Sequence, residues 1–280
     1  MSVNGSDQDT IAINDRGFAY GDGVFETILI HAHQPVLINA HLDRLERGAE
    51  RLKISLNRKL LEQEISDRYV DLPVQGVLKI IVSRGLGGRG YRPANNNDTT
   101  RALSFHPMPD YGDQPVETGV DVFVCQQRLA IQPSLAGIKH LNRLEQVLAS
   151  QEWPEGDFME GIMLDMNDNV IEGTRSNIFW VESGQLYTPS LDRCGVAGIM
   201  RNYLSEHIDG VLETGDCSLT RLLKANEVFL CNSVFGVWPV KSILSDGVVS
   251  LFGGEPDNRV FFHRAHNLFT ELLKNPDAAK

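Results

Sequence analysis

The sequence predicts a mixed α/β protein built from two domains. Runs of β-prone residues alternate with amphipathic helical patterns along 280 residues, a length sufficient for two ordinary domains. A proline-rich polar stretch at residues 108–116 follows a strand pattern and is the best candidate for a linker. We therefore expect a smaller N-terminal α/β domain over residues 1–107 and a larger C-terminal domain over residues 117–280.

The N-terminal domain opens with a hairpin followed by a helix. Residues 24–30 form a β-prone run, and residues 35–38 are expected to be its return strand. Asn39 offers a helix cap, and apolar residues recur at helical spacing from Leu42 to Leu52. The other elements expected here are a helix over residues 58–69 and strands over residues 76–83 and 101–105.

The C-terminal domain continues the alternation of strands and helices. Its expected strands cover residues 120–124, 161–165, 178–181 and 227–231, and its expected helices cover residues 141–150, 198–207 and 261–269.

Composition excludes several function classes. The net charge of −11 and the pI near 5.2 give no basic stripe for a phosphate backbone, so no nucleic-acid partner is expected. The N-terminus lacks the basic start and apolar run of a secretory signal, and no segment approaches the roughly 20 apolar residues of a membrane span. The four cysteines form no C-x-x-C pair and are expected to be reduced and mostly buried. These features favour a cytoplasmic protein.

Two histidine pairs invite a metal interpretation. His31 and His33 alternate near a turn, and His263 and His266 lie in the C-terminal helical pattern. A metal site needs three or four convergent ligands, and no third ligand is evident for either pair. We predict no metal.

The most unusual loop covers residues 84–93 and is rich in glycine and arginine. Such a loop is usually only a flexible strand connection, and no Lys-Ser/Thr pair follows its glycines as in a P-loop. Arg84, Arg89 and Tyr91 would nonetheless suit a ligand that bears carboxylates, because arginine binds carboxylates bidentately.

The chemistry of the chain is expected at Lys139 and Glu172. Most lysines and glutamates are solvated surface charges, but these two lie in small-residue, strand-prone contexts. A lysine amine can form a Schiff base with the aldehyde of pyridoxal phosphate, and a carboxylate can keep the ring nitrogen protonated.

Weaker signals point to an anion site. The turn at residues 194–198 runs into a helix whose N-terminus favours anions, although an ordinary helix start has the same pattern. Ser233 follows a strand end, and Arg44 lies on the first helix, where a surface charge is the default interpretation.

The ordered series of motifs resembles the fold-type IV pyridoxal phosphate enzymes, which include branched-chain and D-amino acid aminotransferases and the aminodeoxychorismate lyases. The resemblance extends from about residue 11 to residue 240. It is carried by Tyr20-Gly21-Asp22-Gly23-Val24-Phe25-Glu26, His41-x-x-Arg44-Leu45, Lys139, Glu172-Gly173 with Asn177, Gly195-x-x-Gly198-Ile199, and Asn232-Ser233.

The resemblance implies pyridoxal 5'-phosphate as cofactor and a C-terminal cofactor-binding domain with a mixed sheet or barrel. It implies that Lys139 carries the cofactor and that Glu172 pairs with the ring nitrogen. The residues that it implies around the rest of the cofactor are Arg44, Asn177, Gly198, the backbone of Ile199 and Met200, and Ser233. It also implies a homodimer whose site lies between the two domains.

Two stretches, residues 83–91 and 135–148, resemble the aminodeoxychorismate lyases in particular. The resemblance therefore implies conversion of 4-amino-4-deoxychorismate to the folate precursor 4-aminobenzoate and pyruvate. Lys139 would be the base, and Arg84, Arg89, Tyr91 and Asn232 would be candidate substrate contacts. Aminotransferases of this group usually carry a tyrosine five residues after the lysine, where this chain has Leu144.

Two alternatives remain open. The first is an amino acid aminotransferase with the same cofactor, which would need an external keto acid. The second is a non-catalytic protein that binds pyridoxal phosphate or a small anion, against which the intact Lys139 and Glu172 argue.

Overall fold

The computed structural model describes residues 1–68, 72–88, 90–94, 98–112, 115–215, 217–252 and 259–274. The chain divides into two compact units. Unit 1 comprises Met1–Pro109 with Ile138–Asn142, and unit 2 comprises Asp110–Gly137 with Arg143–Lys274. The first division falls inside the stretch expected to be a linker, residues 108–116, of which 113–114 lie outside the described residues. The sequence did not predict that a short segment around Lys139 belongs to unit 1.

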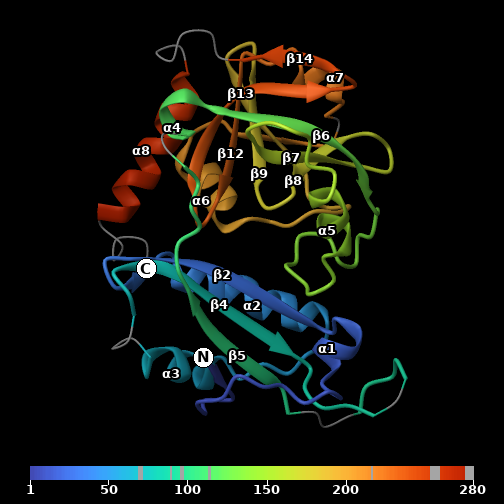
Figure 1. Ribbon diagram of the computed structural model, residues 1–280, viewed down its shortest axis with the longest axis vertical. Coiled ribbons are helices and arrows are strands. Elements are labelled where there is room, and N and C mark those ends of the chain that lie inside the picture. Colours follow the sequence, from blue (N-terminus) through green and yellow to red (C-terminus); the bar gives the residue numbers. More distant parts are fainter. Residues whose placement is uncertain are drawn as a thin grey trace. The chain divides into compact units, whose positions relative to one another are not determined.

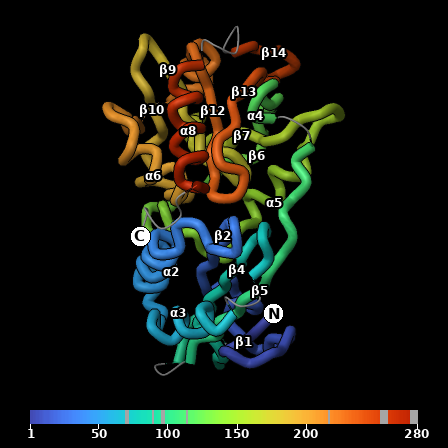
Figure 2. Tube along the Cα trace, turned by 90° about the vertical axis from the view of Figure 1, so that its left-hand side faces the viewer, coloured from blue at the N-terminus to red at the C-terminus, as the bar shows by residue number. Residues whose placement is uncertain are grey.

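Unit 1 is a five-stranded antiparallel sheet with helices on one face (Figures 1 and 2). The strand order is β1-β5-β4-β2-β3. The strands are β1 (Ser2–Val3), β2 (Gly23–His31), β3 (Gln34–Pro35), β4 (Gln75–Ser83) and β5 (Thr100–His106), and the helices are α1 (Arg16–Tyr20), α2 (Ile38–Arg51) and α3 (Arg58–Ser66). The core lies between the sheet and the helices α2 and α3, where Ile28, Leu45, Leu61 and Ile80 are almost fully buried.

Unit 2 holds a nine-stranded mixed sheet in the order β11-β10-β9-β12-β13-β6-β7-β8, with β14 paired to β13. The strands are β6 (Val120–Leu129), β7 (Phe158–Asp165), β8 (Val170–Gly173), β9 (Asn177–Glu182), β10 (Gln185–Pro189), β11 (Leu212–Thr214), β12 (Glu227–Asn232), β13 (Gly236–Ser245) and β14 (Val248–Leu251). The helices are α4 (Pro115–Thr118), α5 (Leu144–Ser150), α6 (Ile199–His207), α7 (Leu219–Leu222) and α8 (Val260–Lys274). Figure 1 shows α8 lying along β12 and β13, onto which it packs Phe262 and Phe269.

Several expected boundaries are wrong. The return strand expected over residues 35–38 ends at Pro35, and Leu37 rather than Asn39 caps α2, with a left-handed φ of 54° and no side-chain cap bond. Burial of Val36 and Leu37 favours this turn into the helix. The helix expected over residues 141–150 begins only at Leu144, because the N–H of Leu141 donates to the carbonyl of Gly23 at 2.9 Å and so joins unit 1.

The helix expected over residues 58–69 ends at Ser66, and residue 69 lies outside the described residues.

All four cysteines are buried and unpaired, as expected, and burial raises the pKa of each thiol to about 12. In the described parts of the chain, no helix is long and apolar enough to cross a membrane.

Candidate active site

Lys139 is held by a strand of unit 1. The N–H of Phe25 donates to the carbonyl of Lys139 at 3.0 Å, and Val24 bridges to His140, so residues 139–141 pair with the start of β2. Glycine is needed at position 23, since a Cβ there would lie 2.7 Å from Cδ1 of Leu141 and 2.5 Å from the carbonyl oxygen of Val82 on β4. The Nζ of Lys139 lies 4.6 Å from the centre of the Phe25 ring. The Lys139 backbone is therefore held by β-type hydrogen bonds, and its amine lies against an aromatic face.

Glu172 is buried at the end of β8 in unit 2. Its Oε2 accepts a hydrogen bond from the N–H of Val196 at 2.8 Å, and its Oε1 lies 3.5 Å from Nε2 of Gln146. Burial lowers the pKa of the nearby Arg143, while the negative charge of Glu172 acts in the opposite direction. Glu172 is thus an oriented carboxylate in a low-dielectric setting, which is what pairing with a protonated ring nitrogen requires.

The turn at residues 195–198 forms hydrogen bonds with both Glu172 and Asn177 and leads into α6. Nδ2 of Asn177 donates to the carbonyl of Val196 at 2.9 Å. Gly198 fits this arrangement because a Cβ there would lie 1.9 Å from Oδ1 of Asn177. Gly198 then caps α6 without a side-chain bond, followed by the buried Ile199 and Met200. Because no side chain caps this helix, the N–H groups of its first turn can donate hydrogen bonds to a bound anion.

Arg44 lies in a buried charged cluster with two residues of unit 1. Its Nε and Nη2 donate to the two carboxylate oxygens of Glu26 at 2.7 and 2.5 Å, and Nδ1 of His41 lies 2.6 Å from Oε2 of Glu26. Burial alone would raise the pKa of Glu26, but Arg44 and His41 lower it to about 2. Burial also lowers the pKa of His41, and the Lys139 charge contributes in the same direction. The charge of Lys139 therefore lies close enough to this cluster to influence the protonation of His41.

Asn232 and Ser233 follow β12 in unit 2. Oδ1 of Asn232 accepts from the N–H groups of Val234 and Phe235, each at 2.8 Å, and its Nδ2 donates to the carbonyl of Arg175 at 3.1 Å. Asn232 therefore orders the turn that presents Ser233, which is half-buried.

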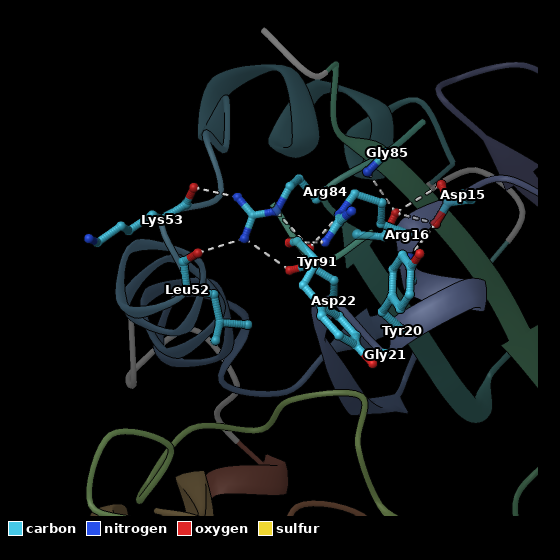
Figure 3. Close-up of polar contacts among 12 residues, drawn as sticks. Asp15, Arg16, Tyr20, Gly21, Asp22, Leu52, Lys53, Arg84, Gly85 and Tyr91 are labelled. Carbon is cyan, nitrogen blue, oxygen red and sulfur yellow. Dashed lines mark hydrogen bonds and ion pairs between the residues drawn. The ribbon is translucent and has the colours of Figure 1, made fainter. Parts of the chain in front are cut away.

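Arg84 is engaged inside unit 1, as Figure 3 shows. Its Nε and Nη2 donate to Asp22 at 2.7 and 2.9 Å, and it also donates to the carbonyls of Leu52 and Lys53, each at 2.7 Å. These contacts use four of its five N–H groups. They tie the end of α2 to the turn before β2.

Arg16 holds the glycine-rich loop that follows Arg84 (Figure 3). Its Nη1 and Nη2 donate to the carbonyls of Gly90 and Tyr91 at 3.0 and 2.9 Å, and its Nε donates to Asp22 at 2.8 Å. The Tyr91 side chain is 87% exposed and meets the Tyr20 ring edge-on. Arg89 lies outside the described residues.

The structure thus brings the predicted residues together in two groups. Unit 2 unites Glu172, Asn177, Gly198 and Ile199 around one turn, whereas unit 1 places Lys139 near the Arg44 cluster. Sequence reasoning did not assign a role to Glu26, although a carboxylate in the apolar run of residues 24–30 was a usable signal. Among the described residues, no group of three or more metal-ligating side chains is present.

Comparison with known proteins agrees with this geometry. The chain matches the family described as "Amino-transferase class IV" over residues 23–243. It is 38% identical to an aminodeoxychorismate lyase of Vibrio harveyi over 93% of each chain. The crystal structure of 4-amino-4-deoxychorismate lyase from Pseudomonas aeruginosa superposes with a TM-score of 0.87 and 43% identity, covering 100% of this chain and 99% of that one.

A branched-chain amino acid aminotransferase from Escherichia coli shares the fold, with a TM-score of 0.82 at 23% identity over 97% of this chain and 92% of that one. The predicted mixed α/β, fold-type IV architecture is therefore confirmed.

Proposed function

Because the chain belongs to the class IV aminotransferase family, we propose that it is a pyridoxal phosphate-dependent lyase that converts 4-amino-4-deoxychorismate to 4-aminobenzoate and pyruvate. One observation carries the proposal. Likeness to two lyases extends over nearly the whole chain at 38% and 43% identity, whereas the Escherichia coli aminotransferase reaches 23%. Leu144 favours the same choice, since a leucine offers no hydroxyl at the position where related aminotransferases usually carry tyrosine.

The residues present fit the cofactor. Lys139 supplies an amine for the aldehyde. Glu172 supplies a buried carboxylate, which the N–H group of Val196 orients through a hydrogen bond to Oε2. Gly195, which precedes Val196, has a φ of +83°, and a Cβ there would lie 2.8 Å from Cγ2 of Ile171, so the turn that contacts Glu172 requires glycine at this position. Arg44, the start of α6 and Ser233 would hold the phosphate.

Pyridoxal phosphate, when bound, supplies an electron-withdrawing ring that stabilises negative charge on the carbon next to the substrate nitrogen. The side chains then have separate tasks. Glu172 holds the proton on the ring nitrogen, and Arg44 is kept in one orientation by Glu26. Nζ of Lys139 removes the proton from the amine-bearing carbon of the substrate. The C–O bond on the neighbouring ring carbon then breaks, and the enolpyruvyl group leaves as enolpyruvate, which takes up a proton to become pyruvate, while the substrate ring becomes aromatic.

Substrate binding by Arg84, Arg89, Tyr91 and Asn232 stays a prediction. The internal contacts of Arg84 leave one N–H group of Nη1 for a ligand, so we propose that Arg84 acts mainly by tying the end of α2 to the turn before β2. A homodimer, a cytoplasmic location and a place in the supply of a folate precursor are further proposals that rest on the resemblance to the family.

The test is product formation from 4-amino-4-deoxychorismate without any keto acid. Equal amounts of 4-aminobenzoate and pyruvate are expected, and Lys139→Ala should lower the rate by about 1,000-fold or more while the unfolding midpoint changes little. Amine transfer that appears only when a keto acid is added would instead identify an aminotransferase. A purified protein with neither activity and no absorbance from bound cofactor would support the non-catalytic alternative.

A further inference from the structure

Arg201 carries a buried positive charge in the first turn of α6. The residue is only 4% exposed. Its Nε donates to Oγ1 of Thr188 at 3.3 Å, and its Nη2 donates to the carbonyl of Pro189 at 2.8 Å. Its carboxylate partner, Glu213, lies 3.0 Å from Nη2, but the Glu213 side chain is 55% exposed. Because solvent screens an exposed carboxylate more than a buried guanidinium, the surroundings of Arg201 keep a net positive potential.

The contacts of Arg201 close the base of the loop that joins β10 to α6. Strand β10 ends at Pro189, whose carbonyl Arg201 binds, and the loop that follows contains the turn at residues 195–198. Oγ1 of Thr188 in turn donates to the carbonyl of Ile178 at 2.9 Å, so the same network reaches β9. The guanidinium is therefore held in one place next to the start of α6.

The charge of Arg201 also acts at the end of β12. Helix α6 packs against β12 (Figure 1). Burial raises the pKa of the Cys231 thiol on this strand, and the Arg201 charge acts in the opposite direction. Cys231 directly precedes Asn232 and Ser233. One buried guanidinium therefore influences both segments of unit 2 that are proposed to hold the cofactor phosphate, the start of α6 and the turn after β12.

The position of Arg201 in its helix is unusual for a cation. A helix N-terminus carries a partial positive charge and favours anions, so a buried cation in the first turn is unfavourable by itself. The first turn of α6 contains no acidic residue that would offset it. A phosphate monoester, with about two negative charges at neutral pH, would offset both the helix dipole and the guanidinium.

We propose that Arg201 is a positioning residue for the cofactor: its buried charge attracts the phosphate of pyridoxal phosphate, and its contacts hold the start of α6 where the phosphate binds. This inference rests on the proposed function, which places the phosphate at α6 and Ser233. Arg201 is not among the residues that the family resemblance implies around the cofactor. Its role concerns the affinity for the phosphate end of the cofactor, not the proton transfer at Lys139.

The experiment compares Arg201→Met, Arg201→Lys and the control Arg221→Met in the full-length protein. Arg221 is a half-buried arginine of the same unit, and it pairs with Glu182 at the opposite end of β9 from Asn177. After the bound cofactor is removed, dissociation constants are measured for pyridoxal phosphate and for pyridoxal, which lacks the phosphate.

We expect Arg201→Met to weaken the binding of pyridoxal phosphate by about 10-fold or more, while the binding of pyridoxal changes by less than about 3-fold. Arg201→Lys keeps the positive charge and should retain most of the affinity for pyridoxal phosphate. The control should bind both ligands as the wild type does. A purely structural role would not separate the two ligands in this way.

Equal weakening of both ligands in Arg201→Met would overturn the inference, and so would an unchanged affinity for pyridoxal phosphate. An equal loss in Arg201→Lys and Arg201→Met would also overturn it, because the charge would then not be the cause. If Arg201→Met does not fold, Arg201→Gln, whose amide can still donate to the Pro189 carbonyl, serves the same comparison. A wild-type protein that binds both ligands equally refutes the proposed phosphate site itself, whereas a variant that keeps the wild-type preference for pyridoxal phosphate refutes only the inference.

Discussion

Each unit contains a fully buried glutamate, Glu26 in unit 1 and Glu160 in unit 2. Their carboxylates are stabilised differently, the first by a charged partner and the second by neutral hydrogen-bond donors. Glu26 of unit 1 binds the Arg44 guanidinium and His41, both from α2. Glu160 of unit 2, on β7, accepts instead from neutral groups: the N–H groups of Gly161 and Thr174 and the hydroxyls of Thr174 and Ser176. Arg175 lies farther away, at 3.8 Å.

The difference shows two routes to a buried carboxylate. Glu26 is neutralised by a charge from another element, so its burial depends on the packing of a helix on a sheet. Glu160 is solvated by the turn at residues 173–176, much as water would solvate it, so its burial depends on local chain geometry. The ion pair of Glu26 orients Arg44. The hydrogen bonds of Glu160 fix the turn at residues 173–176, which connects Glu172 to Asn177 along the chain.

The largest expected effect is on stability when Glu26 loses its charge. Glu26→Gln leaves the buried Arg44 without its counter-ion, and we expect a loss of about 3–5 kcal/mol in the free energy of unfolding. Urea denaturation measures it, with the exposed Glu206→Gln as control. A loss below about 1 kcal/mol would mean that the Arg44 charge is compensated elsewhere and that the two glutamates do not differ as described.

The next largest effect is expected in acid and concerns Glu26. Because the pKa of Glu26 is about 2 in the folded protein, against 4.5 as the ordinary value, its contribution is complete above pH 4.5 and is lost as the pH falls toward 2. This contribution is about 3 kcal/mol, and it should be missing from the pH dependence of Glu26→Gln. Parallel stability curves for wild type and variant over this range would contradict the assignment.

A smaller effect is expected for Glu160→Gln. The amide keeps one acceptor oxygen but turns an NH₂ group toward N–H and O–H donors, so we expect a loss of about 2–3 kcal/mol. Because the turn connects Glu172 and Asn177, the dissociation constant for pyridoxal phosphate should also rise. Wild-type cofactor affinity in a destabilised variant would show that Glu160 serves folding alone.

The smallest effect is expected where the carboxylate is exposed. Glu62 accepts from Nε of Arg58 at 2.8 Å on the surface of α3, one turn along the helix. Glu62→Ala should cost about 0.3–0.5 kcal/mol, because solvent screens exposed ion pairs. If Glu62→Ala lost as much unfolding free energy as Glu160→Gln, the stability effect of a carboxylate would not depend on its burial as described.

Local patterns predicted the strands that follow their own periodicity most clearly. Seven of the eight expected strands lie within β2, β4, β5, β6, β7, β9 and β12, whereas β1, β8, β10, β11, β13 and β14 were not predicted. The errors occur where distant contacts decide, as at Leu141, which pairs with Gly23 instead of starting a helix. Hydropathy patterns contain no information about such a partner, more than a hundred residues away.

The candidate site was predictable only in part for the same reason. Lys139 and Glu172 were selected as candidates from motifs, but the groups that surround them in the structure were not predicted: the Phe25 ring, the Val196 N–H group and Glu160 come from elsewhere in the chain. Arg84 had the residue type of a ligand contact, yet its donors are directed at Asp22 and two carbonyls. Residue type indicates what a group can bind, whereas packing decides what it does bind.

The return of residues 138–142 to unit 1 limits how the chain can be divided. A gene fragment cut after Pro109 would encode the sheet and the helices of unit 1 but would lack residues 138–142, the segment that carries Lys139. The complementary fragment would carry the lysine without Gly23 and Phe25, the residues that hold its backbone. Neither fragment can serve as an independent module, so recombination that exchanges one half of the gene must preserve a match between β2 and a five-residue segment encoded in the other half.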